Sequence, residues 1–83
     1  MKIEYTEKAA EQFEDLPTDV QTRIAHKLSF YLQQEDPLQF AKRLVGMDVY
    51  RFRIGEYRVL FELGKNVLYV LLIVKRDKAY RDL

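Results

Sequence analysis

The sequence lacks cysteine, which excludes disulfide bonds and thiolate metal sites and fits the cytoplasm, where we expect the protein to reside. It also lacks a long apolar segment. The longest apolar run, residues 67–74, is far shorter than the roughly 20 residues that span a bilayer. No apolar stretch typical of a signal peptide follows the N-terminal lysine. Because 48% of the 83 residues are hydrophobic, we expect one globular domain over residues 1–83 that does not enter a membrane.

Histidine is nearly absent as well. His26 is the single histidine and lies off the apolar stripe of a predicted helix, so we interpret it as a surface residue. Without a second histidine or any cysteine, a transition-metal site has little support, and we expect neither a metal nor a cofactor. The sequence contains no glycine-rich phosphate loop and no serine-nucleophile motif, which argues against P-loop nucleotide hydrolases and serine hydrolases.

The net charge of +1 conceals an uneven distribution along the chain. Residues 1–41 contain four basic and eight acidic residues, whereas residues 42–83 contain ten basic and five acidic ones. A polyanion would therefore bind to the C-terminal half. The alternative is that the charges only keep exposed faces solvated, and a difference of this size leaves both interpretations open.

The N-terminal half has the pattern of a short strand followed by two helices. Residues 2–5 alternate like a strand. Thr6 predicts the N-cap of a helix over residues 7–16, which Pro17 interrupts. Thr18-Asp19-Val20-Gln21 has the form of a capping box, which predicts a second helix and therefore an αα-hairpin. The predicted inward-facing residues are Ala9, Ala10, Phe13 and Leu16 in the first helix and Val20, Ile24, Leu28, Tyr31 and Leu32 in the second.

Beyond residue 48 the apolar residues alternate with a period of two. Residues 49–54, 57–63 and 67–74 predict three strands. Gly55-Glu56 fits a two-residue hairpin turn of type II′, with glycine at the first central position. The polar residues 76–83 predict a short tail or one helical turn. The whole pattern predicts an α+β fold, in which an antiparallel sheet carries an N-terminal αα-hairpin on one face in the order β-α-α-β-β-β.

The first predicted hairpin gathers arginines on one face of the sheet. With Gly55-Glu56 as its loop, Arg53 lies opposite Arg58, and Arg51 shares their face because side chains alternate. Like charges directly opposite each other destabilise a sheet, so the cluster makes sense if an anion binds there. Guanidinium groups match the geometry of phosphate and stay charged. The alternative is that the arginines serve solubility or protect a sheet edge.

The third predicted strand is apolar on both faces, as expected for a central strand. If its turn keeps register, Tyr69, Leu71, Ile73 and Lys75 share the face of the arginines. That arrangement predicts a groove with apolar and aromatic walls and a basic rim. Such a groove suits single-stranded RNA, whose bases stack on rings while its phosphates meet cations.

A cationic cluster, Lys75-Arg76-Asp77-Lys78-Ala79-Tyr80-Arg81, follows this strand. Tyr80 is flanked there by Arg and Lys, and nearby cations favour the phenolate form of tyrosine, so Tyr80 is a candidate general base. The alternative, which the chemistry of the sequence alone favours, is that Tyr80 packs on the sheet.

These motifs resemble those of the RelE/ParE toxin superfamily. The resemblance rests on the stretch Arg43-Leu44-Val45-Gly46, on the stretch YRFRIGEYRVLFE from Tyr50 to Glu62, and on the basic tail that contains Tyr80. It implies a toxin of a type II toxin–antitoxin system, with the RelE-like branch favoured. RelE-like toxins cleave mRNA codons in the ribosomal A site, where the ribose 2′-hydroxyl attacks the adjacent phosphate without a metal. The resemblance also implies that a cognate antitoxin neutralises the toxin, and that the two form a hetero-oligomer that binds operator DNA.

The resemblance also implies roles for individual residues. Arg58 would stabilise charge that develops on the phosphate, Arg53 would assist the reaction, Arg76 would act on the side of the leaving oxygen, and Tyr80 would act as the base. The predicted RNA-binding residues are Arg51, Lys75, Lys78 and Arg81. Lys75 stands where many members of the superfamily have histidine, and the spacing from Arg76 to Tyr80 differs from that of the best-studied RelE branch.

Two alternatives remain at this point. A ParE-like inhibitor of DNA gyrase shares the fold but does not cleave RNA. A catalytically inactive member would serve as an antitoxin-binding or regulatory module. For the RelE-like reading, we expect Arg58→Ala to abolish growth arrest and to leave the fold intact, because the side chain points away from the predicted core.

Overall fold

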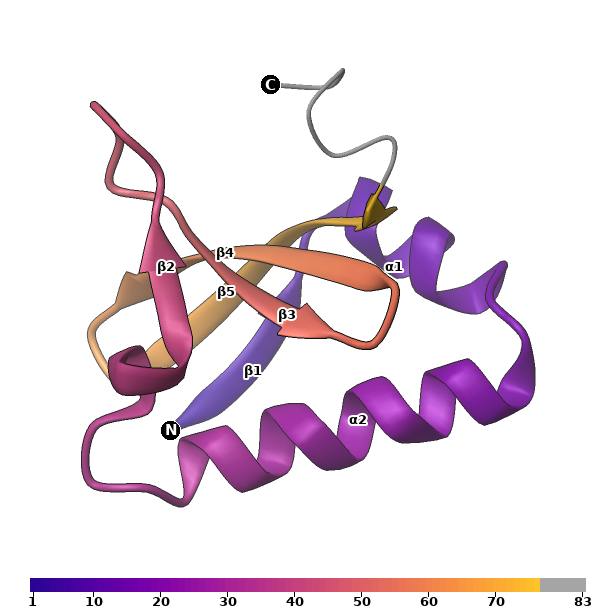
Figure 1. The fold of residues 1–83 in the computed structure, drawn as a ribbon, viewed down its shortest axis with the longest axis horizontal. Coiled ribbons are helices and arrows are strands. Elements are labelled where there is room, and N and C mark those ends of the chain that lie inside the picture. The colour runs from indigo at the N-terminus through magenta and orange to yellow at the C-terminus, as the bar shows by residue number, and fades with distance from the viewer. Residues whose placement is uncertain (77–83) are drawn as a thin grey trace.

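The computed structural model describes residues 1–76. Its strands form one sheet, and its helices cover one side of that sheet (Figure 1). Lys78, Tyr80 and Arg81 lie outside the described residues, so the structure does not test the predictions made for them. The elements follow in the order β1 (Lys2–Tyr5), α1 (Glu7–Glu14), α2 (Thr18–Leu32), η1 (Pro37–Phe40), β2 (Ala41–Arg43), β3 (Tyr50–Ile54), β4 (Tyr57–Gly64) and β5 (Val67–Lys75).

The five strands form a single sheet in the order β1-β5-β4-β3-β2. The α+β class and the N-terminal helical hairpin are confirmed, but the sheet differs from the prediction in two ways. β1 pairs with β5 in a parallel arrangement, so the sheet is mixed. In addition, residues 41–43 form the strand β2, which pairs with β3 at the other edge of the sheet. The sequence did not predict β2 because three residues are too few to show a period.

The two helices begin in different ways. The prediction for α1 is confirmed, since the side chain of Thr6 accepts a hydrogen bond from the N–H of Ala9 and caps the helix. The predicted capping box of α2 is wrong. Pro17 occupies the N-cap position, and no side chain caps the first turn of α2. Gln21 instead donates its side-chain amide to the carbonyl oxygens of Glu14 and Leu16, which ties α2 to the end of α1.

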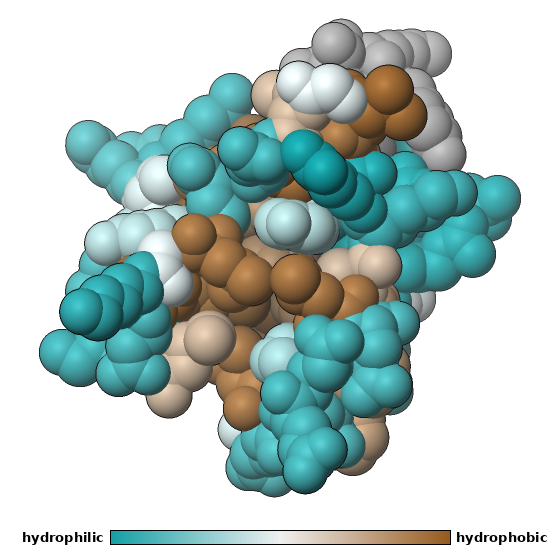
Figure 2. All heavy atoms as spheres, turned by 90° about the vertical axis from the view of Figure 1, so that its left-hand side faces the viewer, coloured by the Kyte–Doolittle hydropathy of each residue, from teal (hydrophilic) through white to brown (hydrophobic). Residues whose placement is uncertain are grey.

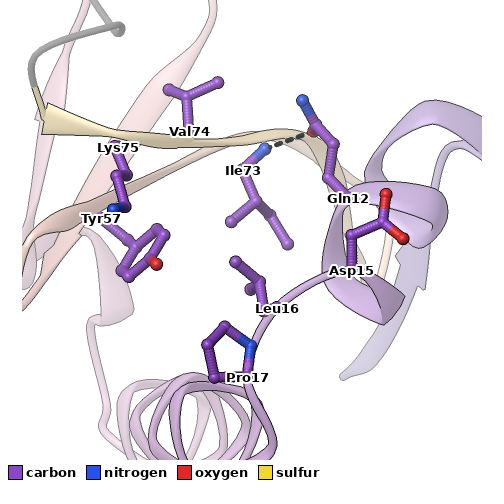
Figure 3. A pocket seen from close by; sticks show the side chains of 8 residues that line it. All are labelled: Gln12, Asp15, Leu16, Pro17, Tyr57, Ile73, Val74 and Lys75. Carbon is purple, nitrogen blue, oxygen red and sulfur yellow. Dashed lines mark hydrogen bonds between the residues drawn. The ribbon is translucent and has the colours of Figure 1, made fainter.

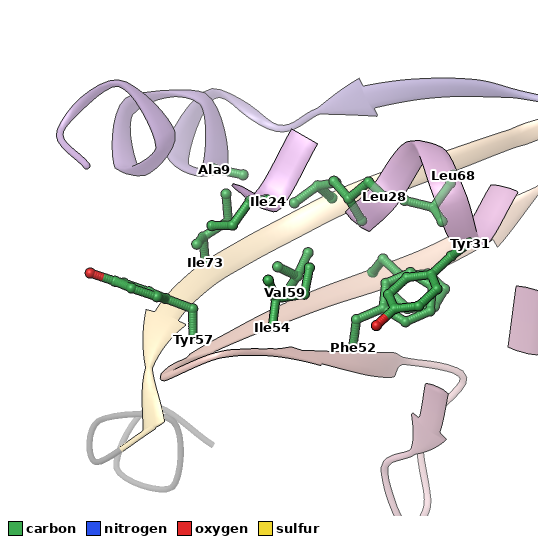
Figure 4. Packing of buried hydrophobic residues seen from close by; sticks show 12 residues of the cluster. Ala9, Ile24, Leu28, Tyr31, Phe52, Ile54, Tyr57, Val59, Leu68 and Ile73 are labelled. Atoms are coloured by element: carbon green, nitrogen blue, oxygen red, sulfur yellow. The ribbon is translucent and has the colours of Figure 1, made fainter. Parts of the chain in front are cut away.

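The main core lies between the helices and the sheet (Figure 4). Ile24 and Leu28 point from α2 toward the sheet and are fully buried, as predicted. Tyr31 packs on Phe52 of β3, with ring centroids 4.5 Å apart. The other core residues come from α1, β3, β4 and β5 and include Ala9, Ile54, Tyr57, Val59, Phe61, Leu68, Val70 and Ile73. Burial of these apolar side chains is the dominant contribution to stability and fixes which face of the sheet turns away from the helices.

A β-bulge changes the register of β5 against β4. Leu60 pairs with Leu72, but the next residue, Phe61, pairs with Val70, so Leu71 has no partner on β4. The extra residue reverses which side chains of β5 face the helices on either side of the bulge. The prediction that β5 is covered on both faces is confirmed, because it contributes buried residues to both apolar clusters of the sheet.

The second cluster lies on the face of the sheet opposite the helices. It consists of Leu60 and Val74, with Leu44, Val49 and Leu72 packed against them. Leu44 and Val49 belong to the connection between β2 and β3, which therefore folds over this face. The connection turns at Gly46, where φ is +77°. Among the described residues, neither helix combines the length and the apolar character needed to cross a membrane.

Candidate nucleic-acid interface

The turn between β3 and β4 brings two arginines together. Gly55 has a φ of +59° while Glu56 keeps a negative φ, as in a type II′ turn. Ile54 pairs with Tyr57, and the next pair outward is Arg53 with Arg58, as predicted. In a hairpin of this length the second pair is not hydrogen-bonded, so the two Cα atoms lie about 4.5 Å apart. The side chains of Arg53 and Arg58 are therefore adjacent on the sheet face opposite the helices. We call this face, which also carries Arg51, the arginine face.

The three predicted arginines differ in exposure. Arg53 is exposed, Arg51 is half-buried and Arg58 is 0% exposed. The expectation that Arg58 lies outside any core is therefore wrong. Its side chain points away from the helices, but it lies beside the second apolar cluster, next to Leu60 along the strand and opposite Val74 on β5.

Lys42 is a fourth cation on this face that the sequence did not predict as part of the site. It lies on β2 and pairs with Arg51 of β3, so its side chain emerges on the arginine face. Because Arg53 is in a non-hydrogen-bonded pair with β4, Arg51 and Lys42 form a hydrogen-bonded pair across β2 and β3, with Cα atoms about 5.5 Å apart. Two like-charge pairs therefore lie side by side, at Lys42–Arg51 and Arg53–Arg58. The sequence analysis missed Lys42 because it did not predict the strand β2.

Arg76 joins the same end of the sheet. Its backbone N–H donates a 2.7 Å hydrogen bond to the carbonyl oxygen of Glu56 in the β3–β4 turn. Arg76 directly follows Lys75, the last residue of β5. The backbone of Arg76 therefore lies next to the turn from which the Arg53–Arg58 pair begins.

Lys75 does not belong to this group. It pairs with Tyr57, a residue of the main core, and lies with it at a pocket of about 470 Å³ between the sheet and the end of α1 (Figure 3). Figure 3 shows Val74 and Lys75 pointing to opposite sides of β5. The expectation that Ile73 and Lys75 share the arginine face is wrong, because the bulge at Leu71 shifts their register.

The prediction that aromatic walls and cations line one groove is also wrong. Tyr69 does lie on the arginine face, but its neighbours across the strands are Glu4 and Glu62, far along the sheet from the Arg53–Arg58 pair. Near that pair, the surface is formed instead by Leu60 and the residues packed against it. The cations and the aromatic wall therefore occupy different ends of the same face.

In the part of the chain that the structure describes, the cations Arg51 and Arg53 are not paired with carboxylates. Within residues 1–76, an ion pair joins Arg43 to Asp48 at 2.8 Å, and no ion pair involves Arg51 or Arg53. Arg43 also donates to the carbonyl oxygen of Met47, so it holds the β2–β3 connection in shape. Among the described residues, Arg51 and Arg53 therefore have no carboxylate partner that would compete with an external anion.

A titratable group with a shifted pKa, the Tyr5 hydroxyl, lies away from the arginine face. Burial raises the pKa of the Tyr5 hydroxyl, but Tyr5 packs on Phe13 of α1 on the helix side of the sheet, with ring centroids 5.7 Å apart. Among residues 1–76, no group of three or more His, Asp or Glu side chains is arranged to hold a metal ion. The chemistry that the arginine face offers is recognition of phosphate and stabilisation of negative charge by guanidinium groups.

Known proteins share this fold. The family model described as the ParE toxin of a type II toxin–antitoxin system, parDE, matches residues 3–80. The chain belongs to this family. It is therefore a toxin of a type II toxin–antitoxin system, as the motif resemblance implied. No curated protein sequence matches the toxin at a significant level.

Solved structures show the same fold. The isolated E. coli RelE toxin superposes with a TM-score of 0.75 at 22% identity, over 99% of this chain and 98% of that one. RelE of the intact E. coli RelBE toxin–antitoxin complex gives a TM-score of 0.73 at 22% identity, over 89% and 94% of the two chains. The RelB–RelE complex of Methanococcus jannaschii gives 0.75 at 16% identity, over 96% and 98%. The toxin therefore has a RelE-like fold.

Proposed function

We propose that this toxin is a ribosome-dependent endoribonuclease that cleaves mRNA codons in the A site. One observation carries the proposal: two pairs of like-charged residues, Arg53–Arg58 and Lys42–Arg51, lie side by side on one sheet face. Clustered cations on one face attract a polyanion, and guanidinium groups match the geometry of phosphate. Single-stranded mRNA on the ribosome supplies consecutive phosphates that can meet these neighbouring cations.

The chemistry needs no group other than side chains and the RNA itself. The 2′-oxygen bonds to the adjacent phosphorus while the bond from phosphorus to the 5′-oxygen breaks, which leaves a 2′,3′-cyclic phosphate. Tyr80, as its phenolate, takes the proton of the 2′-hydroxyl. Arg76 stabilises the departing 5′-oxygen, which takes a proton from water, and the hydroxide formed removes the proton from Tyr80. Arg58 and Arg53 stabilise the additional negative charge of the transition state. Arg51 and Lys42 hold the neighbouring phosphates, and Lys78 and Arg81 extend the predicted RNA contacts of the tail.

The burial of Arg58 adds a condition to this mechanism. A guanidinium that is 0% exposed reaches a phosphate only when the part of the protein that covers it moves. Its low-dielectric surroundings then strengthen its attraction for the charge of the transition state. Binding of the ribosome-held mRNA must therefore be coupled to uncovering of Arg58, which fits an enzyme that acts on RNA only at the ribosome.

A cognate antitoxin is the second proposed partner. The side of the molecule that carries β2 presents an apolar area framed by hydrophilic residues (Figure 2). Large apolar residues that remain exposed include Phe40, Val45, Met47 and Leu63. Apolar surface of this kind favours association with a protein. We propose that the antitoxin buries part of it, and that the resulting hetero-oligomer binds operator DNA.

Inhibition of DNA gyrase is the second candidate function, and the observation in its favour is the match to the ParE family model. A catalytically inactive, antitoxin-binding member is the third. The cationic cluster favours the RNA-cleaving function, because clustered cations on one face attract a polyanion such as RNA.

A translation extract with an end-labelled mRNA separates the three. The proposed function predicts cleavage at codon-phased positions, only while ribosomes translate, with 2′,3′-cyclic phosphate at the new ends. Inhibition of gyrase supercoiling without mRNA cleavage would establish the second function. Neither effect, together with tight antitoxin binding, would establish the third.

A further inference from the structure

Cations also gather on α2, away from the arginine face. Arg23, His26, Lys27 and Phe30 follow one another along one side of the helix and line a hollow of about 320 Å³. All four side chains are exposed. The ring of Phe30 is 48% exposed, and the Nζ of Lys27 lies 6.0 Å from its centroid. The α2 hollow thus combines cationic walls with an aromatic surface.

Arg23 connects the α2 hollow to the β3–β4 turn. A Cβ atom placed on Gly55 would lie 3.2 Å from the Nη1 of Arg23, so this guanidinium rests on the turn itself. The Arg53–Arg58 pair begins at the same turn, and Arg76 is hydrogen-bonded to it. Cations from both sides of the sheet therefore meet around one tight turn.

A carboxylate lies on the same helix as the cations of the α2 hollow. Asp19 precedes Arg23 by one helical turn, a spacing that favours an ion pair. Nevertheless, in the part of the chain that the structure describes, neither Arg23 nor Lys27 forms an ion pair. Arg23 and Lys27 are four residues apart, and like charges at this spacing destabilise a helix. A bound anion would relieve that repulsion, as on the arginine face.

We propose that the α2 hollow is a second phosphate-binding site, which holds RNA of the ribosome–mRNA complex outside the cleaved codon. RNA fits because its phosphates match the cations and an unstacked base matches the ring of Phe30. The continuous phosphate backbone of RNA also explains why cations lie on both sides of the turn at Gly55. An acidic protein segment would meet the same cations, but it gives no reason for that arrangement. This inference rests on the proposed function and adds a place where the rest of the RNA binds.

Ribosome binding by the full-length toxin tests the α2 hollow. The double variant Arg23→Ala, Lys27→Ala loses two positive charges from it, and alanine favours helix. The matched control, Lys8→Ala, Lys65→Ala, loses two exposed lysines elsewhere. Affinity for mRNA-programmed 70S ribosomes and for a 20-nucleotide single-stranded RNA is measured at several salt concentrations. Each lost phosphate contact lowers the slope of log K against log salt by roughly 0.7–0.9.

For the α2 variant we therefore expect a slope smaller by about 1.5 and ribosome affinity roughly 30-fold weaker at 0.1 M salt, while the control stays near wild type. If wild type binds and cleaves but the α2 variant matches the control, the inference is wrong and the proposed function stands. If wild type neither binds nor cleaves, both fail. Unchanged RNA binding with weakened binding of a 20-residue polyglutamate peptide would assign the hollow to an acidic protein partner and overturn the inference.

Discussion

Replacement of Arg58 separates its proposed role in catalysis from its role in the fold. Arg58 is 0% exposed, so Arg58→Ala removes buried methylenes worth about 2 kcal/mol and leaves a cavity, for a total cost of roughly 3 kcal/mol. A domain of 83 residues has an unfolding free energy of only about 4–12 kcal/mol, so a loss of activity in the alanine variant would be ambiguous. Methionine keeps most of the side-chain volume and removes the charge. Because it leaves a smaller cavity than alanine does, we expect Arg58→Met to lower the unfolding free energy less than Arg58→Ala does.

The activity of Arg58→Met should fall by roughly 10²–10³-fold, the usual effect of removing one group that stabilises transition-state charge. Thermal denaturation measures the stability of wild type, Arg58→Ala and Arg58→Met, and codon-phased mRNA cleavage in a translation extract measures their activity. If Arg58→Met is as stable as wild type and cleaves mRNA at the same rate, Arg58 is a structural residue and the reasoning about its charge is refuted.

Three further predictions concern the frame of the site. Thr6→Ala should lower the unfolding free energy by about 1–2 kcal/mol in a denaturant titration, because the hydroxyl both caps α1 and donates to the carbonyl oxygen of Leu71; a change below about 0.5 kcal/mol would contradict this. Gly55→Ala should lower it by at least about 1 kcal/mol, because φ is +59° and the new methyl group would lie 3.2 Å from the Arg23 guanidinium; wild-type stability would show that the turn is not type II′. Asp48→Ala breaks an exposed ion pair and should change stability by no more than about 0.5 kcal/mol, so a loss of several kcal/mol would reveal a larger role for the β2–β3 connection.

Local patterns predicted most of the fold. The helical stripes, the Thr6 cap and the Gly55-Glu56 turn each depend on neighbouring residues, and each was confirmed. The register of the first hairpin followed from the length of its turn alone, which is why the Arg53–Arg58 pair could be predicted.

The errors arose where one residue changes a long-range register or where an element is too short to have a period. The bulge at Leu71 moved Lys75 to the helix side of the sheet, and no local signal marks it. The three-residue strand β2 brought Lys42 into the cluster. The burial of Arg58 depends on what packs over the sheet, which alternation along a strand does not specify.

The face assignment suggests the most direct test of the proposed site. Arg53→Gln and Lys75→Gln each remove one positive charge from an exposed residue, but Arg53 lies on the arginine face and Lys75 on the helix side. Single-turnover cleavage of mRNA on programmed ribosomes is measured for both variants and for wild type. We predict that Arg53→Gln lowers the rate by at least about tenfold, because it removes a charge-assisted contact to phosphate, and that Lys75→Gln stays within about twofold of wild type. Equal effects of the two substitutions, or a larger effect of Lys75→Gln, would contradict the assignment of the arginine face as the phosphate-binding surface.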